Sequence, residues 1–174
     1  MSTPFSYAGN TAGAVSTPDS INPLLSTYYQ FTISRLPNVN YFCQTASLPS
    51  LSLLQVSMPT RFTTLQSPSK ITFDELTVTF VVDEAMKNWM EIYNWMRSTT
   101  NVDSYEQYVP DHTQYTTGNL IVLNSSKNPK LNITFNRLFP ITLSALDFTS
   151  IVVDPEPLQA TCSFSYTSYD IEIL

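Results

Sequence analysis

The sequence predicts a mainly β protein, a barrel or sandwich of about seven strands with one α-helix at about residues 84–97 packed against it. Several segments alternate apolar and hydroxyl-bearing residues, as half-buried strands do. One segment repeats apolar residues with a helical period. Charged residues make up only 13% of the 174-residue chain, against roughly 25% in an ordinary domain, and Ser and Thr supply the polar faces instead.

The chain divides into an arm and one domain. Residues 1–26 are rich in Ser, Thr, Pro, Asn and Gly and have no apolar period, so we expect an extended N-terminal arm. Residues 27–174 are expected to form a single domain, because 43% of the chain is hydrophobic and 13% aromatic, enough to bury a core. A surface so poor in charge is typical of a protein that meets other subunits over much of its area.

Two strands are expected to open the domain. Tyr29, Phe31 and Ile33 lie on one face of the first, with polar residues between them. A second, short strand is predicted at residues 41–46. It ends before Pro49, because proline has no backbone N–H to donate to a strand ladder.

A long loop is predicted at about residues 54–71, where the alternation fades and two prolines follow. Loops of this length in compact domains are usually functional or disordered. Its exposed apolar residues would suit a docking contact with another subunit. The candidate contact residues on it are Pro59, Arg61, Phe62, Leu65 and Lys70.

Residues 72–82 form the clearest strand pattern, and the period then changes to a helical one with Asp83 as N-cap. Four large side chains at helical spacing are interpreted as the core face of this helix: Met86, Trp89, Tyr93 and Met96. A cofactor-binding stripe would use similar residues, but core packing is much the commoner reason for such spacing.

After the helix, residues 98–117 are polar and are predicted to be a loop. Four further strands are expected, at residues 119–123, 131–135, about 146–151 and 158–167. The turn at residues 125–129 should join the first two of these as a hairpin.

The sequence holds no catalytic, cofactor-binding or metal-binding set, so we expect a protein that is not an enzyme and has no cofactor. His112 is the only histidine, and three glycines are too few for a phosphate-binding loop. Cys43 and Cys162 match no metal or redox motif. Two buried free thiols are the favoured interpretation, with a disulfide across neighbouring strands as the alternative.

The net charge of −6 argues against a nucleic-acid binder, because phosphate contacts require clustered Lys and Arg. The chain opens on neither a basic stretch nor an apolar one, and no apolar run approaches the roughly 18 residues of a membrane span. Neither export by a signal peptide nor membrane insertion is expected.

Six strings in a fixed order carry a family resemblance: FTISRLP at 31–37, VNYFCQTASLP at 39–49, TFDELTVTFVVDE at 72–84, WMEIYNW at 89–95, LFPITLSAL at 138–146 and ATCSFSY at 160–166. Together they resemble the tail tube proteins of contractile-tailed bacteriophages, over roughly residues 28–171. The same fold serves tube initiators, baseplate adaptors, tail terminators and the tubes of phage-like injection devices.

The resemblance implies a tail-tube-type β-barrel or sandwich in which six copies close into a ring with one continuous inner sheet. It implies that stacked homohexameric rings form the inner tail tube, a conduit for genome ejection. In this family the long loop, here at about residues 54–71, reaches the neighbouring ring. Alternation alone does not tell which strand faces line the lumen.

The implied partners are other copies of the chain, a tail sheath protein outside, and a tape measure protein followed by DNA inside, without sequence-specific binding. A baseplate initiator and a tail terminator would meet the ends of the tube. No membrane insertion by this chain is implied. The expected location is the virion tail, after assembly in the host cytoplasm.

Two alternatives stay open. The chain could form a single ring of the same particle, as a tube initiator, baseplate adaptor or tail terminator, or the tube of a phage-like injection system. From another class, it could be an enzyme or a carbohydrate-binding β-sandwich that uses its paired carboxylates and loop tyrosines. That alternative requires a deep pocket with convergent carboxylates.

Overall fold

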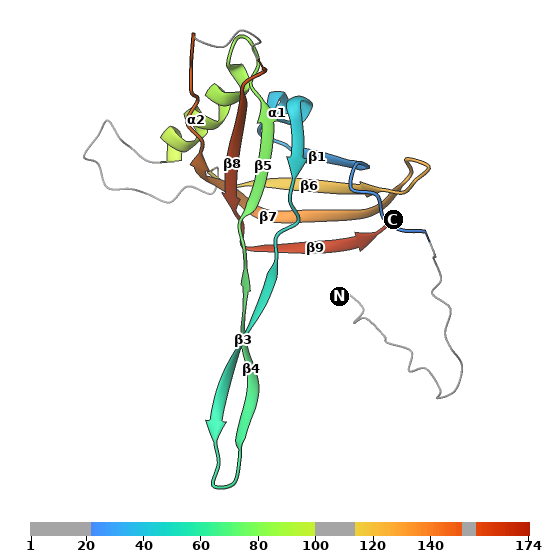
Figure 1. Ribbon diagram of the computed structural model, residues 1–174, viewed down its shortest axis with the longest axis vertical. Helices are drawn as coiled ribbons and strands as arrows, with labels where there is room; N and C mark the ends of the chain where they lie inside the picture. The colour runs from blue at the N-terminus through green and yellow to red at the C-terminus, as the bar shows by residue number, and fades with distance from the viewer. Residues whose placement is uncertain (1–21, 100–113, 151–155) are drawn as a thin grey trace, which may run out of the picture.

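The computed structural model describes residues 22–99, 114–150 and 156–174 (Figure 1). These residues form nine strands and two helices. In chain order they are β1 (Tyr29–Ile33), α1 (Pro37–Phe42), β2 (Cys43–Ala46), β3 (Leu51–Pro59), β4 (Thr64–Phe73), β5 (Leu76–Val81), α2 (Lys87–Thr99), β6 (Thr116–Leu123), β7 (Pro129–Leu143), β8 (Gln159–Ser165) and β9 (Ser168–Ile173).

Seven strands form one antiparallel sheet in the order β1-β6-β7-β8-β5-β2, with β9 also paired to β7. The 15-residue β7 pairs with β9 over Leu131–Asn136 and with β8 from Phe139 onward. Between these parts stands Arg137, with φ 55°. The sheet therefore has two halves that cross in Figure 1: the β1 sheet, made of β1, β6, β7 and β9, and the β8 sheet, made of β2, β5, β7 and β8.

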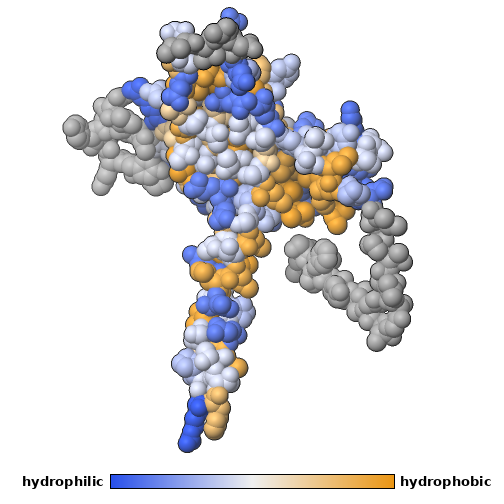
Figure 2. All heavy atoms as spheres, viewed as in Figure 1, coloured by the Kyte–Doolittle hydropathy of each residue, from blue (hydrophilic) through white to orange (hydrophobic). Residues whose placement is uncertain are grey.

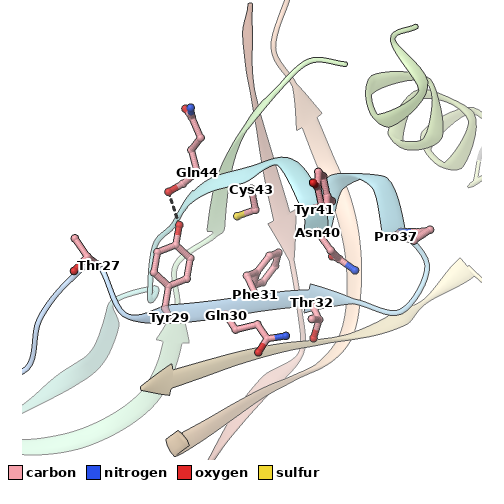
Figure 3. A pocket seen from close by; sticks show the side chains of 10 residues that line it. All are labelled: Thr27, Tyr29, Gln30, Phe31, Thr32, Pro37, Asn40, Tyr41, Cys43 and Gln44. Carbon is pink, nitrogen blue, oxygen red and sulfur yellow. Dashed lines mark hydrogen bonds between the residues drawn. The ribbon is translucent and has the colours of Figure 1, made fainter. Parts of the chain in front are cut away.

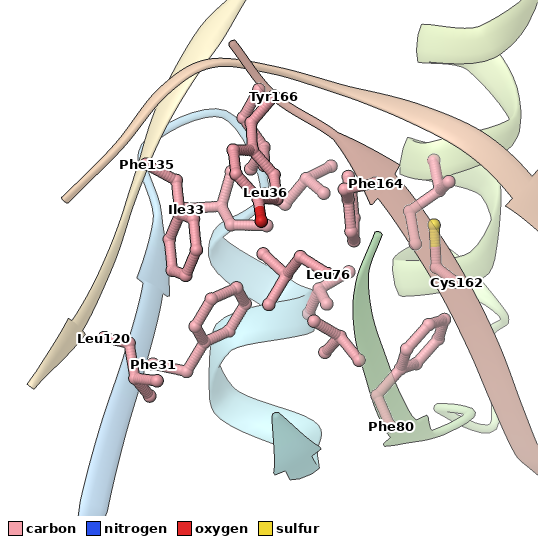
Figure 4. Packing of buried hydrophobic residues seen from close by; sticks show 14 of the residues in the cluster. Phe31, Ile33, Leu36, Leu76, Phe80, Leu120, Phe135, Cys162, Phe164 and Tyr166 are labelled. Carbon is pink, nitrogen blue, oxygen red and sulfur yellow. The ribbon is translucent and has the colours of Figure 1, made fainter. Parts of the chain in front are cut away.

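The hydrophobic core lies between the two halves (Figure 4). Phe31, Ile33 and Phe135 enter it from the β1 sheet, and Phe80 and Phe164 enter it from the β8 sheet. All five side chains are buried, because strand alternation sends every second residue to this face. The two helices cover the remaining sides of the core, with Val39 of α1 and Ile92 and Trp95 of α2 buried.

The predicted mainly β class is confirmed, and so are the α-helix and the hairpin between β6 and β7. The described strands form an open sheet and not a closed barrel. There are nine strands rather than about seven: β9 was not predicted, and the described residues 144–150 contain no strand where one was expected at about 146–151. The expected arm falls mostly on residues 1–21, outside the described residues.

The predicted loop at about residues 54–71 is wrong as local structure, because β3 and β4 form an antiparallel hairpin there. Pro59 stands at the end of β3, and Pro68 lies beside a register shift between Leu53 and Gln55. Proline is tolerated at such bulges and on edge strands. Every strand in a two-stranded sheet is an edge strand, so the prolines do not interrupt this one.

The second strand also begins later than predicted. Residues 37–42 form α1, with Pro37 in its first turn, where the missing backbone N–H is not needed. Only Cys43–Ala46 belongs to β2. At the other side of the hairpin, Thr72 and Phe73 belong to β4, so β5 starts at Leu76 rather than at residue 72.

The core face of α2 is rotated from the predicted one. Its buried residues are Asn88, Ile92 and Trp95. Trp89 and Met96 are half-buried at the edge of the core. Two predicted core residues lie elsewhere: Met86 precedes the helix with φ 54°, and Tyr93 is 39% exposed, with its ring stacked on Trp89.

Asn88 explains this rotation, because its buried side chain satisfies three backbone groups where β5 meets α2. Its Nδ2 donates to Val81 O at 2.7 Å, and its Oδ1 accepts from the backbone N–H groups of Asp83 at 3.2 Å and Trp89 at 2.9 Å. A buried backbone group left without a partner is costly. The helix therefore turns the polar Asn88 toward the core.

We expect Asn88→Leu to lower the free energy of unfolding by roughly 2–4 kcal/mol, because it leaves several buried backbone groups without partners. Chemical denaturation followed by circular dichroism measures this. Asn94→Leu, at an exposed position of the same helix, is the matched control and should change stability by less than about 0.5 kcal/mol. Equal stability of the two variants would contradict the role assigned to Asn88.

Candidate assembly surfaces

The β3–β4 hairpin projects from the body of the molecule (Figure 1). All of β3 and most of β4 are exposed. Three of its cross-strand pairs are wholly apolar: Leu51–Phe73, Leu53–Ile71 and Met58–Leu65. An isolated two-stranded hairpin is marginally stable in water, and contiguous exposed apolar surface marks an interaction site. The hairpin is therefore a candidate contact surface.

The contact residues predicted from the sequence all lie on this hairpin, and all are exposed. Pro59 ends β3, whereas Leu65 and Lys70 lie in β4. Arg61 and Phe62 occupy the tip. The Phe62 side chain is 92% exposed, and the Arg61 guanidinium lies 5.7 Å from the centre of its ring. The structure therefore gathers the five on one projecting element, while their contact role stays a prediction.

A second surface is the face of the β1 sheet that points away from the core, here called the polar face. Its residues alternate with the buried ones and align across four strands by register. The two complete rows are Thr32–Asn119–Thr134–Asp170 and Gln30–Ile121–Asn132–Glu172. Apart from Ile121, these rows contain amides, hydroxyls and two carboxylates, and they contain no Lys or Arg. Next to them, Asn136 Nδ2 donates to Asp170 Oδ2 at 2.7 Å.

The two edges of the β1 sheet are a third feature, which the sequence did not reveal. Among the described strands, β1 pairs only with β6 and β9 pairs only with β7. The β1 edge is closed at one point, where the Asn40 side chain accepts from Ile33 N at 2.7 Å and donates to Ile33 O at 2.9 Å. Elsewhere these edges present backbone groups that another strand could pair with.

A pocket of about 620 Å³ opens beside the β1 edge, between β1 and the α1–β2 segment (Figure 3). Tyr29, Phe31 and Cys43 line it, and the Tyr29 hydroxyl donates to Gln44 O across it. Burial is the main cause that raises the pKa of both Tyr29 and Cys43. The pocket is therefore partly shielded from water, although it is open at the edge.

The described residues show no feature that favours a catalytic or metal-binding site. Three pockets that described residues form have no Asp or Glu in their linings. The described residues contain no group of three or more His, Cys, Asp or Glu that could hold a metal ion. His112 lies outside them. Cys43 and Cys162 are free, and burial raises the pKa of Cys162 to about 12, so its thiol stays protonated near neutral pH.

Neither described helix combines the length and the apolar character needed to cross a membrane.

Known proteins resemble this chain in both sequence and fold. At the sequence level it is 33% identical over 106 residues to the tail tube terminator protein of Enterobacteria phage T4, an alignment that covers 58% of this chain. The chain spans 57% of the length of that curated relative.

Two solved structures are similar in fold. The tube terminating cap of the anti-feeding prophage has a TM-score of 0.68 at 13% identity, over 94% of this chain and all of that chain. A chain from the sheath–tube complex of the PVC extracellular contractile injection system has a TM-score of 0.65 at 11% identity, over 91% of this chain and all of that chain. At such identities these structures establish the fold alone.

The phage tail tube protein family model matches residues 15–172, which includes both halves of the sheet, the hairpin and α2. The chain therefore belongs to the phage tail tube protein family, whose members are structural components of virion tails and not enzymes.

Proposed function

We propose that this chain forms a closed ring of six identical copies that belongs to a phage tail tube. The observation that carries the proposal is the pair of unpaired edges of the β1 sheet. Because β1, β6, β7 and β9 are antiparallel in turn, β9 of one copy runs antiparallel to β1 of the next. Repeating this contact closes a barrel and removes every exposed edge of the β1 sheet.

In such a ring the polar face of the β1 sheet lines the lumen, because the opposite face is buried in the core. DNA is a polyanion that binds to clustered Lys and Arg through counterion release. A wall of amides, hydroxyls and the carboxylates of Asp170 and Glu172 offers no such site. A tape measure protein, and then DNA, could therefore pass without being held.

The β3–β4 hairpin would make the contact between rings. It projects well beyond the sheet, and its apolar cross-strand pairs lack cover among the described residues. Docking against a neighbouring ring would bury them and stabilise a hairpin that is marginal on its own.

Two positions in the tail fit such a ring. The 33% identity to the phage T4 protein, a tail tube terminator, favours a single ring at the end of the tube. The family model favours a repeated tube subunit that meets the sheath on its outer side. We give preference to the terminator, since the sequence likeness is to a protein with that role, whereas the similar folds include both tube and terminator.

Quantitative mass spectrometry of purified virions tests the position, and negative-stain microscopy of the purified chain tests the ring. A terminator should be present as one ring per virion, and a tube subunit should be among the most abundant virion proteins. An abundance typical of a tube subunit would overturn the terminator assignment but would leave the proposed ring standing. Persistent monomers under all assembly conditions, including with an initiator complex, would overturn the ring itself.

A further inference from the structure

We infer that, in the ring proposed above, the side chains of Ile171 and Ile173 from one copy insert into the pocket between β1 and α1–β2 of the next copy. This inference rests on the proposed ring and goes further, because it names the two surfaces that meet. It assigns the pocket a ligand: an isoleucine pair presented by a second copy of this chain.

The two isoleucines lie on the core face of the sheet but have no cover among the described residues. Register places Phe31, Leu120, Ile133 and Ile171 in one row on the core face of the β1 sheet. The first three are at most 4% exposed, but Ile171 is 54% exposed, and Ile173 on the same face is 71% exposed. Figure 2 shows the apolar surface that gathers around β9. Within the described parts of the chain the opposing layer stops short of β9, so a second copy is a suitable cover for this end of the core face.

The pocket lies at the opposite edge of the same sheet, where core-face residues of β1 line it together with Gln30 and Thr32 of the polar face. Tyr29 and Phe31 belong to the core face of β1, and they form one wall of the pocket, with Cys43 opposite (Figure 3). Tyr41 stands at the rim and is 84% exposed. A cavity of about 150 Å³ is enough to bind benzene. A pocket of about 620 Å³ therefore has room for two isoleucine side chains.

The backbone hydrogen bonds of β1 show which residues point toward its open edge. Tyr28 O accepts from Leu123 N at 3.0 Å, and Ser34 N donates to Thr117 O at 3.4 Å, so even-numbered residues pair with β6. In an antiparallel ladder the residues between them turn their N–H and C=O groups the other way. Ile33 does so, because the Asn40 side chain occupies both of its groups.

The same alternation holds in β9. Leu174 N donates to Lys130 O at 3.0 Å, so even-numbered residues of this segment pair with β7. The backbone groups of Ile171 and Ile173 therefore point toward the open edge. Both edges thus present odd-numbered residues, whose side chains lie on the core face. When the two edges pair, the isoleucines face the pocket side of the joined sheet.

Asn40 restricts the register of this pairing. It closes the edge at Ile33, so Tyr29 and Phe31 remain available on β1. Ile171 opposite Phe31 and Ile173 opposite Tyr29 is the register that uses both isoleucines.

On the other face, this register sets Asp170 opposite Thr32 and Glu172 opposite Gln30, with no like charges in contact. A slip of one residue would instead set Ile171 and Ile173 opposite even-numbered residues of β1. The backbone groups of those residues point toward β6, so the slipped edges would form no hydrogen-bonded ladder.

Cross-linking within the assembled ring tests the inference, because Cys43 lies in the pocket and the only other cysteine, Cys162, is fully buried. Ile171→Cys and Ile173→Cys are each expected to form intermolecular bonds to the native Cys43 of the next copy. A short bismaleimide or a mild oxidant at alkaline pH should give a ladder of covalent multimers on a non-reducing gel.

Glu172→Cys is the matched control, since it lies on the opposite face of the same strand, and it should give no ladder. Adding Cys43→Ser to Ile173→Cys should abolish the ladder. Two results would overturn this inference and leave the proposed ring standing. The first is that the wild type forms rings of normal size but neither isoleucine variant gives a ladder. The second is that Glu172→Cys gives a ladder. If the wild-type chain forms no rings, both the inference and the ring are overturned.

A second measurement avoids cysteine chemistry. Ile173→Asp should leave the monomer folded, because the side chain is already exposed, and should weaken each subunit contact by at least about tenfold. Sedimentation should then show monomers at concentrations where the wild type forms rings. Rings as stable as those of the wild type would contradict the inference.

Discussion

Replacing Leu54, Val56 and Met58 together with serine is expected to leave rings intact and to abolish their docking onto neighbouring rings. These residues alternate along β3, so they share one face of the hairpin, and all three are exposed in the single chain. Burying each in a contact would contribute roughly 1.5–3 kcal/mol, and every copy in the ring makes the same contact. The loss should therefore exceed what the unchanged residues of the hairpin can offset.

Electron microscopy of assembled tails distinguishes these outcomes, because undocked rings remain separate from the tube. The matched control replaces Ser52, Gln55 and Ser57 with alanine, which changes the same strand without removing an apolar residue. The serine variant should also fold like the wild type, since no buried residue changes. Tails that join normally with the triple serine variant would show that this face of the hairpin does not carry the contact between rings.

Reversing the charge of the polar face, by Asp170→Lys with Glu172→Lys, is expected to slow the passage of DNA several-fold at low salt. The substitutions would place clustered ammonium groups along the wall, and such groups bind phosphates with release of counterions. Because this binding weakens steeply with ionic strength, the rate should recover as salt is raised. Ejection of DNA from purified phage, followed by light scattering or a fluorescent dye, measures the effect.

Asp170→Asn with Glu172→Gln is the neutral control, and it should eject DNA at the wild-type rate. It keeps oxygen and amide groups at both positions, so Asn136 retains a side chain to bond with. If particles shown to contain the lysine variant eject DNA at the wild-type rate at every salt concentration, the polar face does not line the lumen.

Elements that alternate between a buried and an exposed face could be predicted from the sequence. β5 and β8 bury every second residue against the core, and their apolar and hydroxyl residues follow that period. The hairpin could not be predicted in the same way, because both of its faces are exposed in the single chain. Without a buried face nothing keeps the alternation in phase, and it shifts by one residue at Leu53 and Leu54. The prolines then suggested a loop.

Short and peripheral elements were missed for related reasons. The six residues of α1 are too few to show a helical period, and the last two, Tyr41 and Phe42, were taken as part of a strand. β9 carries alternating Tyr169, Ile171 and Ile173, but two of its three polar residues, Asp170 and Glu172, are charged rather than hydroxyl-bearing. The core face of α2 differed from the predicted one because a buried asparagine, Asn88, cannot be told from an exposed one by residue type.

The sequence by itself determined the mainly β class, the helix, the shortage of charge and the residues that share a strand face, because these follow from local composition and period. Only the tertiary structure decided which face is covered. The polar face, the open edges and the uncovered Ile171 and Ile173 depend on strand order, and strand order joins β1, β6, β7 and β9 from distant parts of the chain. No local pattern records such pairings, because each strand would show the same alternation beside any neighbour.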